Sequence, residues 1–199
     1  LLSSLSYSKF GDLKMGTNGG QDSYLRPEYV ERQNNGDVIV QNKNPRIQRF
    51  TGYNQLNFLQ KIRFKPTKHW DLQYSFTYAG TGDAPRYDRL IQYRNGALRF
   101  AEWNYGPMLW RMHNLQVLHS KKNSIYDDAR FTVAYQNYEE SRIDRTRASN
   151  NRNKQIDQVD AVSVNWDATK RIGKARLPDK QGQLFYGFEY VHNKVGSFG

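Results

Sequence analysis

Strict alternation of apolar and polar side chains over nine residues constrains this chain more than any other feature. Residues 70–78 read WDLQYSFTY, so every second side chain is large and apolar and the ones between are small or polar. A period of two is that of a β-strand with one apolar and one polar face. Residues 56–64 carry the same pattern, and the two segments together predict an antiparallel hairpin.

A register centred on Thr67 satisfies both faces of this hairpin. The predicted apolar pairs are Phe64 with Trp70, Ile62 with Leu72, Phe58 with Phe76 and Leu56 with Tyr78. On the polar face, Arg63 would lie opposite Asp71 and Lys61 opposite Gln73.

The aromatic residues at the strand ends favour a membrane setting over a soluble sandwich. Trp and Tyr at the ends of an apolar strand face are typical of an interfacial girdle, whereas a soluble sandwich hides a mostly aliphatic face. The mean hydropathy is −0.91. No stretch approaches the ~18 apolar residues of a spanning helix, but a membrane strand needs only ~10 residues with every second one apolar.

Seven strands are expected, and long and short connections alternate between them. The strands are residues 2–9, 46–64, 70–79, 109–119, 129–137, 156–168 and 184–194. The long connections are 11–44, 80–108 and 138–155, and the short ones are 65–69, 120–128 and 169–183. Short turns on one rim and long loops on the other are typical of an outer-membrane barrel with extracellular loops. The last short turn contains an insertion, 177–183, that the pattern does not explain.

The later strands repeat the same two faces. The expected lipid-facing residues are Leu115, Val117, Phe131, Val133, Tyr135, Val162, Val164, Trp166, Leu184, Tyr186, Phe188 and Tyr190. The expected lumen-facing residues are Asn114, Gln116, Thr132, Ala134, Gln136, Ser163, Asn165, Asp167, Gly187 and Glu189. Bacterial single-chain barrels close with an even number of strands, so seven strands predict an arc of a larger barrel. Leu1 opens directly on strand-like sequence, and a mature or truncated start is expected.

Several local motifs resemble one family. They are Tyr53–Phe58 running into Arg63–Pro66, Arg86–Leu90, Leu98–Pro107, Glu139–Arg145 and Phe185–Asn193. Over most of its length the chain resembles the barrel of TonB-dependent outer-membrane receptors, especially those of heme and haemoglobin or siderophore uptake.

The resemblance implies a barrel of about 22 strands closed by a separate plug. It further implies import of a scarce nutrient such as a ferric siderophore or heme, driven by the TonB complex, in the outer membrane of a Gram-negative bacterium. Residues 1–199 would form part of one barrel domain. The plug, the N-terminal segment that contacts TonB and the remaining strands have no counterpart in this sequence.

The distribution of charge argues against a nucleic-acid partner, although the formal net charge is +11. The three long connections carry 13 Lys and Arg against 11 Asp and Glu, so the excess lies elsewhere. Arg49, Lys61 and Arg63 share one parity and would form a basic wall in the lumen, facing the plug or an anionic substrate. A charge ladder satisfied by Asp71 and by plug carboxylates is the alternative for these residues.

The second long connection holds the candidate ligand contacts. They combine guanidinium groups with aromatic rings, which suits a planar anionic ligand: Arg86, Tyr87, Arg89, Arg99, Trp103 and Tyr105. A loop bound to itself by Arg–Asp pairs and a buried Trp103 is the alternative.

The sequence gives little support to an enzyme or to a metal site. It has no cysteine, no phosphate-binding glycine loop and no nucleophile elbow. His113 and His119 lie roughly 20 Å apart on one strand at ~3.3 Å per residue, too far to share an ion. We therefore expect an all-β transmembrane arc that transports without covalent chemistry and without a cofactor. A soluble β-sheet module that binds polyanions or glycans is the alternative.

Overall fold

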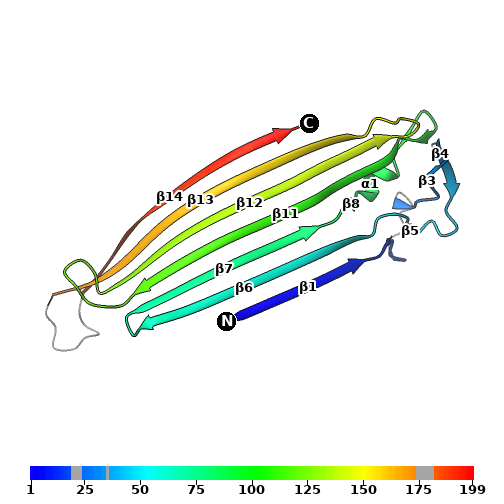
Figure 1. Ribbon diagram of the computed structural model, residues 1–199. Helices are drawn as coiled ribbons and strands as arrows, with labels where there is room; N and C mark the ends of the chain where they lie inside the picture. Colours follow the sequence, from blue (N-terminus) through cyan, green and yellow to red (C-terminus); the bar gives the residue numbers. More distant parts are fainter. Residues whose placement is uncertain (19–23, 35, 174–181) are drawn as a thin grey trace.

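A long, curved antiparallel sheet makes up most of the computed structural model (Figure 1), which describes residues 1–18, 24–34, 36–173 and 182–199. Seven strands follow one another across it in sequence order: β1 (Leu2–Phe10), β6 (Tyr53–Thr67), β7 (Trp70–Thr81), β11 (Phe100–His119), β12 (Asp128–Thr146), β13 (Asn153–Ile172) and β14 (Gly182–Phe198). The short strand β8 (Ala84–Pro85) pairs with the start of β11. The prediction of an all-β chain is confirmed.

The strand register confirms the two predicted faces. Directly paired residues of antiparallel strands place their side chains on the same face. One row of the apolar face runs Phe64, Leu72, Val117, Phe131, Trp166 and Phe188, and the next runs Ile62, Tyr74, Leu115, Val133, Val164 and Tyr190. One row of the opposite face runs Arg63, Gln73, Gln116, Thr132, Asn165 and Glu189.

The register predicted for the first hairpin is wrong by two residues. Phe64 pairs with Leu72 instead of Trp70, and Ile62 pairs with Tyr74. Pro66 has no N–H to donate, and the ladder is irregular between Phe64 and Thr67 before it closes on Thr67 and Trp70. A shift of two preserves the faces, which is why alternation alone could not detect it.

Most strands are longer than predicted, and β11, β12 and β13 the most, because alternation of apolar residues stops before the backbone pairing does. β11 begins at Phe100 and not at 109, β12 continues to Thr146 and not to 137, and β13 begins at Asn153. The expected long loop 138–155 is therefore wrong, since only residues 147–152 connect β12 to β13. The strand expected to begin at 46 begins at Tyr53.

The irregular elements gather at one end of the sheet, opposite the β6–β7 turn (Figure 1). They are β2 (Leu13–Lys14) paired with β5 (Ile47–Gln48), β3 (Glu28–Gln33) paired with β4 (Gly36–Gln41), β9 (Tyr93–Arg94) paired with β10 (Ala97–Leu98), and the single helical turn α1 (Tyr87–Leu90). We call this the loop end and the other the turn end. Of the predicted insertion 177–183, residues 177–181 lie outside the described residues, and Gly182 and Gln183 begin β14.

Most of the buried apolar side chains lie at the loop end and not on the apolar face of the sheet. Val30, Leu90, Leu98, Phe100 and Ile143 are nearly inaccessible to solvent. In contrast, large residues of the apolar face are exposed, among them Leu5, Ile62, Phe64, Phe188 and Tyr190, with exposed fractions of 48–71%. No helix among the described residues is long and apolar enough to cross a membrane.

Candidate functional site: the loop-end arginine cluster and the polar face

The structure brings four of the six predicted ligand contacts together at the loop end. The Arg86 guanidinium lies 5.0 Å from the ring centroid of Trp103 and 5.4 Å from that of Tyr105, and it donates a hydrogen bond of 3.1 Å to the Tyr105 hydroxyl. The Arg89 guanidinium lies 5.7 Å from the Trp103 ring. α1 carries Arg89, and the edge of β11 carries both rings. The cluster is therefore a cation–π stack built between two neighbouring elements.

Arg86 is already satisfied within the protein. Its Nε donates 2.9 Å to an Asp88 oxygen and its Nη2 donates 2.5 Å to the other, which gives a bidentate pair. This hydrogen bonding holds the pKa of the Asp88 carboxyl below its usual range. For Arg86, the self-bonded loop that the sequence left as an alternative is the arrangement that the structure contains.

Arg89 retains unused hydrogen-bonding capacity, because its Nε is buried and has no hydrogen-bond partner among the described residues. The last two predicted contacts lie outside this cluster. Arg99 stacks on the ring of Phe100 at 4.6 Å, and Tyr87 meets Tyr24 edge-on with ring centroids 6.0 Å apart.

The predicted basic wall consists of Lys61 and Arg63 but not of Arg49. Arg49 lies between β5 and β6, where it approaches Asp12 at 4.0 Å and its carbonyl accepts a hydrogen bond from Arg26. The prediction for Arg49 is wrong because the chain turns at residues 49–50, which interrupts the parity that linked it to Lys61.

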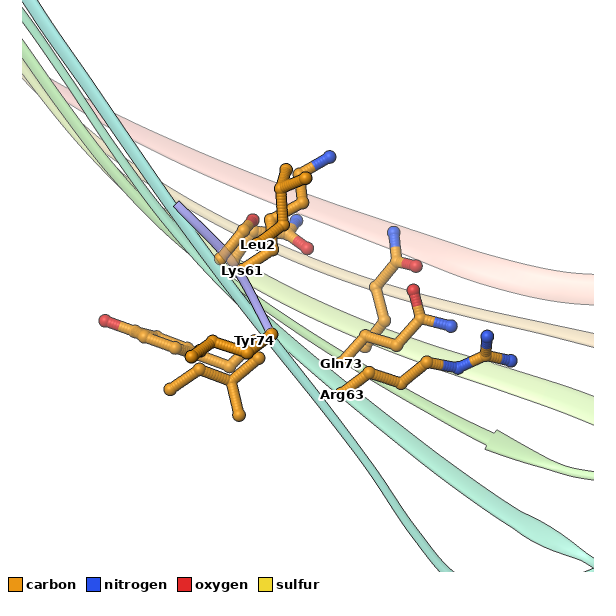
Figure 2. A pocket seen from close by; sticks show the side chains of 10 residues that line it. Leu2, Lys61, Arg63, Gln73 and Tyr74 are labelled. Atoms are coloured by element: carbon orange, nitrogen blue, oxygen red, sulfur yellow. The ribbon is translucent and has the colours of Figure 1, made fainter. Parts of the chain in front are cut away.

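Lys61 and Arg63 border a shallow cavity of about 290 Å³ on the polar face of the sheet. Figure 2 shows Lys61, Arg63 and Gln73 on the concave side of the curved ribbon, with Tyr74 on the convex side. Arg63 donates two hydrogen bonds, 2.8 and 3.0 Å, from Nε to the Asp71 carboxylate, so only Lys61 offers a cation without a carboxylate partner among the described residues here.

Uncommitted polar side chains surround Lys61. No hydrogen bond is found in the described part of the chain for the side chains of Gln73, Ser75, Asn114 and Gln116. They come from β7 and β11, and each offers donors or acceptors toward the concave space. This surface suits a hydrogen-bonding partner better than an apolar one.

A buried ionic junction at the loop end escaped the sequence analysis. Asp37, in the β3–β4 hairpin, accepts hydrogen bonds of 2.7 and 3.0 Å from Arg145 and 2.9 Å from the backbone N–H of Ala148. Its side chain is fully buried, and Arg32 approaches it at 3.3 Å. Hydrogen bonding to Arg145 above all lowers the pKa of the Asp37 carboxyl to about 2. The pair links residues 108 positions apart, and no local pattern signals such a contact.

Three histidines form hydrogen bonds with tyrosine side chains or with the backbone, and none of these bonds joins two histidines. His113 shares a 2.8 Å hydrogen bond with the Tyr74 hydroxyl, His119 one of 2.8 Å with Tyr126, and His69 one of 2.9 Å with the Ser120 carbonyl. Across the described ranges, no group of three or more His, Asp or Glu side chains is placed to hold a metal ion.

Comparison of the chain with protein-family models, with curated proteins and with solved structures found no match.

Proposed function

We propose that this chain forms an arc of an outer-membrane β-barrel receptor of the TonB-dependent type, in a Gram-negative bacterium. The receptor binds a scarce nutrient such as a ferric siderophore or heme at the cell surface and imports it with TonB-coupled energy. The continuous apolar face on the outside of the curve carries the proposal. The resemblance of the loop and strand motifs to such receptors supports the energy coupling and the class of ligand.

The apolar face is too extensive to leave in water. It runs across all seven main strands, and several of its large side chains are more than half exposed. Contiguous exposed apolar patches beyond a few hundred Å² mark an interaction surface or a membrane surface. The polar face lies on the concave side (Figure 2). Polar inside and apolar outside is the arrangement of a transmembrane barrel and the reverse of a soluble one.

The apolar band crosses the strands obliquely, as tilted strands in a bilayer require. On β14 the apolar band covers Leu184 to Tyr190, whereas on β1 it consists of Leu5 and Tyr7. Through the strand pairing, Leu5 lies in the same row as Lys194 of β14, and Tyr7 lies two residues further along. The displacement is about six to eight residues over seven strands, which corresponds to a tilt of roughly 35–43° at ~3.4 Å per residue and ~4.8 Å between strands. Outer-membrane strands tilt by about 35–45°.

A polar row closes the band toward the loop end on β11–β14. Arg111, Asn137, Asp160 and Lys194 lie in register on the convex face. Arg111 donates 3.1 Å to Asn137, and Asn137 donates 2.8 Å to Asp160. Such a satisfied polar belt is compatible with the water-facing edge of a bilayer and would be costly at its centre.

For ligand capture, the loop-end cluster is the best placed. Arg89 and Arg99 form no salt bridge in the described part of the chain, although the charge of Arg89 acts on the neighbouring Asp88, and each guanidinium lies over an aromatic ring. A planar anionic ligand such as heme, or an iron chelate that bears carboxylates, would gain charge and stacking there.

A pair of substitutions on adjacent residues tests the membrane assignment. Phe76→Arg places a charge on the convex face, whereas Thr77→Arg places the same charge on the concave face of the same strand. A charge at the bilayer midplane costs about 2–4 kcal/mol, so Phe76→Arg should reduce the amount of protein that resists carbonate extraction from membranes, and Thr77→Arg should not.

The opposite result has a clear meaning. If the wild-type protein were recovered in the water-soluble fraction without detergent, the receptor proposal would be wrong. The uncommitted amides around Lys61 would then favour a soluble module that binds glycans or polyanions on its concave face.

A further inference from the structure

Excess positive charge gathers in the described turns at the turn end of the sheet. Residues 65–69, 120–128 and 169–173 contain six Lys and Arg and two Asp, an excess of four, against a net charge of +11 for the whole sequence. The three long connections expected from the sequence have an excess of only two. The short described turns therefore carry more excess positive charge than the much longer connections.

The described turns at this end form one continuous rim. The backbone N–H of Ser120 donates 2.9 Å to the His69 carbonyl, and the His69 ring shares a 2.9 Å hydrogen bond with the Ser120 carbonyl. The Tyr186 hydroxyl on β14 donates 2.5 Å to the Ile125 carbonyl. We call residues 65–69, 120–128 and 169–173 the basic rim.

Within the basic rim, two of the cations are neutralised and four are not. Lys65 approaches Asp71 at 3.5 Å, and Lys170 approaches the buried Asp127 at 3.0 Å. Among the described residues the side chains of Lys68, Lys121, Lys122 and Arg171 form no salt bridge, although the charge of Lys122 also acts on Asp127, and Asp128 lies nearby without a salt bridge. The rim therefore presents a surplus of solvated ammonium and guanidinium groups.

Aromatic residues lie along the margin of the apolar band nearest to these cations. Trp70 and His119 are paired on the convex face with ring centroids 4.2 Å apart, and Tyr126 meets His119 edge-on at 5.6 Å. Beside them Trp166 meets Tyr186 at 5.5 Å. Amphipathic rings of this kind lie at the headgroup level of a bilayer. Ile125, at the tip of the β11–β12 turn, is 61% exposed.

We infer that the basic rim binds the phosphate groups of anionic phospholipids in the leaflet that surrounds the turn end. The inference rests on the proposed membrane location, because it requires the aromatic residues at this margin to lie at a bilayer surface. Lysines just beyond an aromatic belt are at the height of the lipid phosphates, and each one adds to the attraction for an anionic leaflet. The rim thereby fixes the depth of the sheet in the membrane and holds a shell of anionic lipid around it.

The test uses the full-length protein, extracted from membranes in a neutral detergent and titrated with phosphatidylglycerol or phosphatidylcholine. Native mass spectrometry gives the affinity for each lipid. The variant Lys68→Gln/Lys121→Gln/Lys122→Gln should bind phosphatidylglycerol at least about tenfold more weakly, given the contribution of each lysine at a membrane surface. Its affinity for zwitterionic phosphatidylcholine should not change.

A control variant removes the same charge from the other end of the molecule. Lys14, Lys43 and Lys154 are exposed and lie at the loop end. Their triple change to Gln should leave binding of phosphatidylglycerol as it is. A titration with glycerol phosphate tests for a simple phosphate site, and it should produce no binding at the concentrations at which the lipid binds.

Each contrary result overturns the inference in a recognisable way. Equal affinity of the rim variant and the wild type for phosphatidylglycerol, or an equal loss in the control variant, would exclude the rim as the lipid site. If these results came from a protein that resists carbonate extraction, the receptor proposal would stand. A protein that needs no detergent would overturn both.

Discussion

At the scale of single residues, the charged groups of the loop end divide into those that hold the loops together and those that remain free. Asp37 on β4 and Arg145 on β12 form a buried pair, and Arg86 forms a bidentate pair with Asp88. Arg26 is also buried, and burial lowers the pKa of its guanidinium to about 10. Arg89 and Arg99 are the arginines of the predicted ligand set that form no such ion pair.

The Asp37 junction predicts an acid-sensitive loop. The pKa of Asp37 is about 2 in the folded protein, below its ordinary value. The stabilisation it provides is therefore complete above about pH 4 and is lost as the pH falls toward 2. Hydrogen exchange of the β3–β4 hairpin should accelerate over this interval.

Removal of the carboxylate should have the same effect at neutral pH. Asp37→Ala leaves the largely buried Arg145 without its partner, at a local cost of about 3 kcal/mol. Exchange in β3–β4 that is unchanged in this variant would show that the junction does not hold the hairpin.

Ligand uptake should separate the two kinds of arginine. Arg89→Gln together with Arg99→Gln should reduce binding of an anionic iron chelate or heme by roughly tenfold, as expected for the loss of two charged contacts. The thermal midpoint should hardly change. Arg86→Gln should instead lower the midpoint, since it breaks the pair with Asp88. Unchanged binding in the double variant would remove these residues from the ligand site.

At the scale of elements, the β11 strand depends on a glycine where its pairing with β12 is interrupted. Gly106 has φ +101°, and a Cβ there would lie 2.6 Å from the Gly82 carbonyl oxygen. Gly106→Ala should cost about 1–3 kcal/mol and loosen the segment that carries Trp103 and Tyr105. Gly96 also has a positive φ, of +76°, but an added Cβ there meets no atom within 4 Å.

The matched change Gly96→Ala therefore isolates the clash from the strain. Both variants should be compared by denaturant unfolding, and Gly106→Ala should show the larger loss. Equal losses would mean that the close approach to Gly82 contributes nothing.

The same elements show how far the sequence could predict this fold. Alternation identified all seven long strands and both of their faces, because burial of one face constrains every second residue. It did not give the ends of β11, β12 and β13, since the regular alternation of apolar and polar residues stops there while the backbone ladder continues. It did not give the hairpin register, because a slip of two keeps every side chain on its face.

The candidate site was less predictable than the strands. Arg86, Arg89, Trp103 and Tyr105 are close in sequence, and their clustering follows from the pairing of one loop with β11. The prediction for Arg49 was wrong because a turn interrupts the alternation, and Asp37 was missed because its partner Arg145 lies on β12, far away in the sequence.

At the scale of the whole molecule, the two outer edges of the described sheet have unpaired backbone groups that need hydrogen-bond partners. β1 and β14 each pair on one side only within the described residues. Unpaired backbone groups within a bilayer cost several kcal/mol each, so a membrane-embedded sheet must close on further strands. In membrane-extracted protein, backbone amides along both outer edges should exchange as slowly as those of β11. Exchange as fast as in the loops would contradict a closed barrel.

The oblique path of the apolar band makes turn length a determinant of depth. Two extra residues in a strand-connecting turn can leave each side chain on its correct face, yet displace the next strand by about 7 Å along its axis. The apolar residues of that strand would then no longer line up with the apolar band of its neighbours. Turn-end insertions that shift the strand register should therefore be excluded far more strictly than insertions among β2 to β5, which pair outside the main ladder and position no part of it.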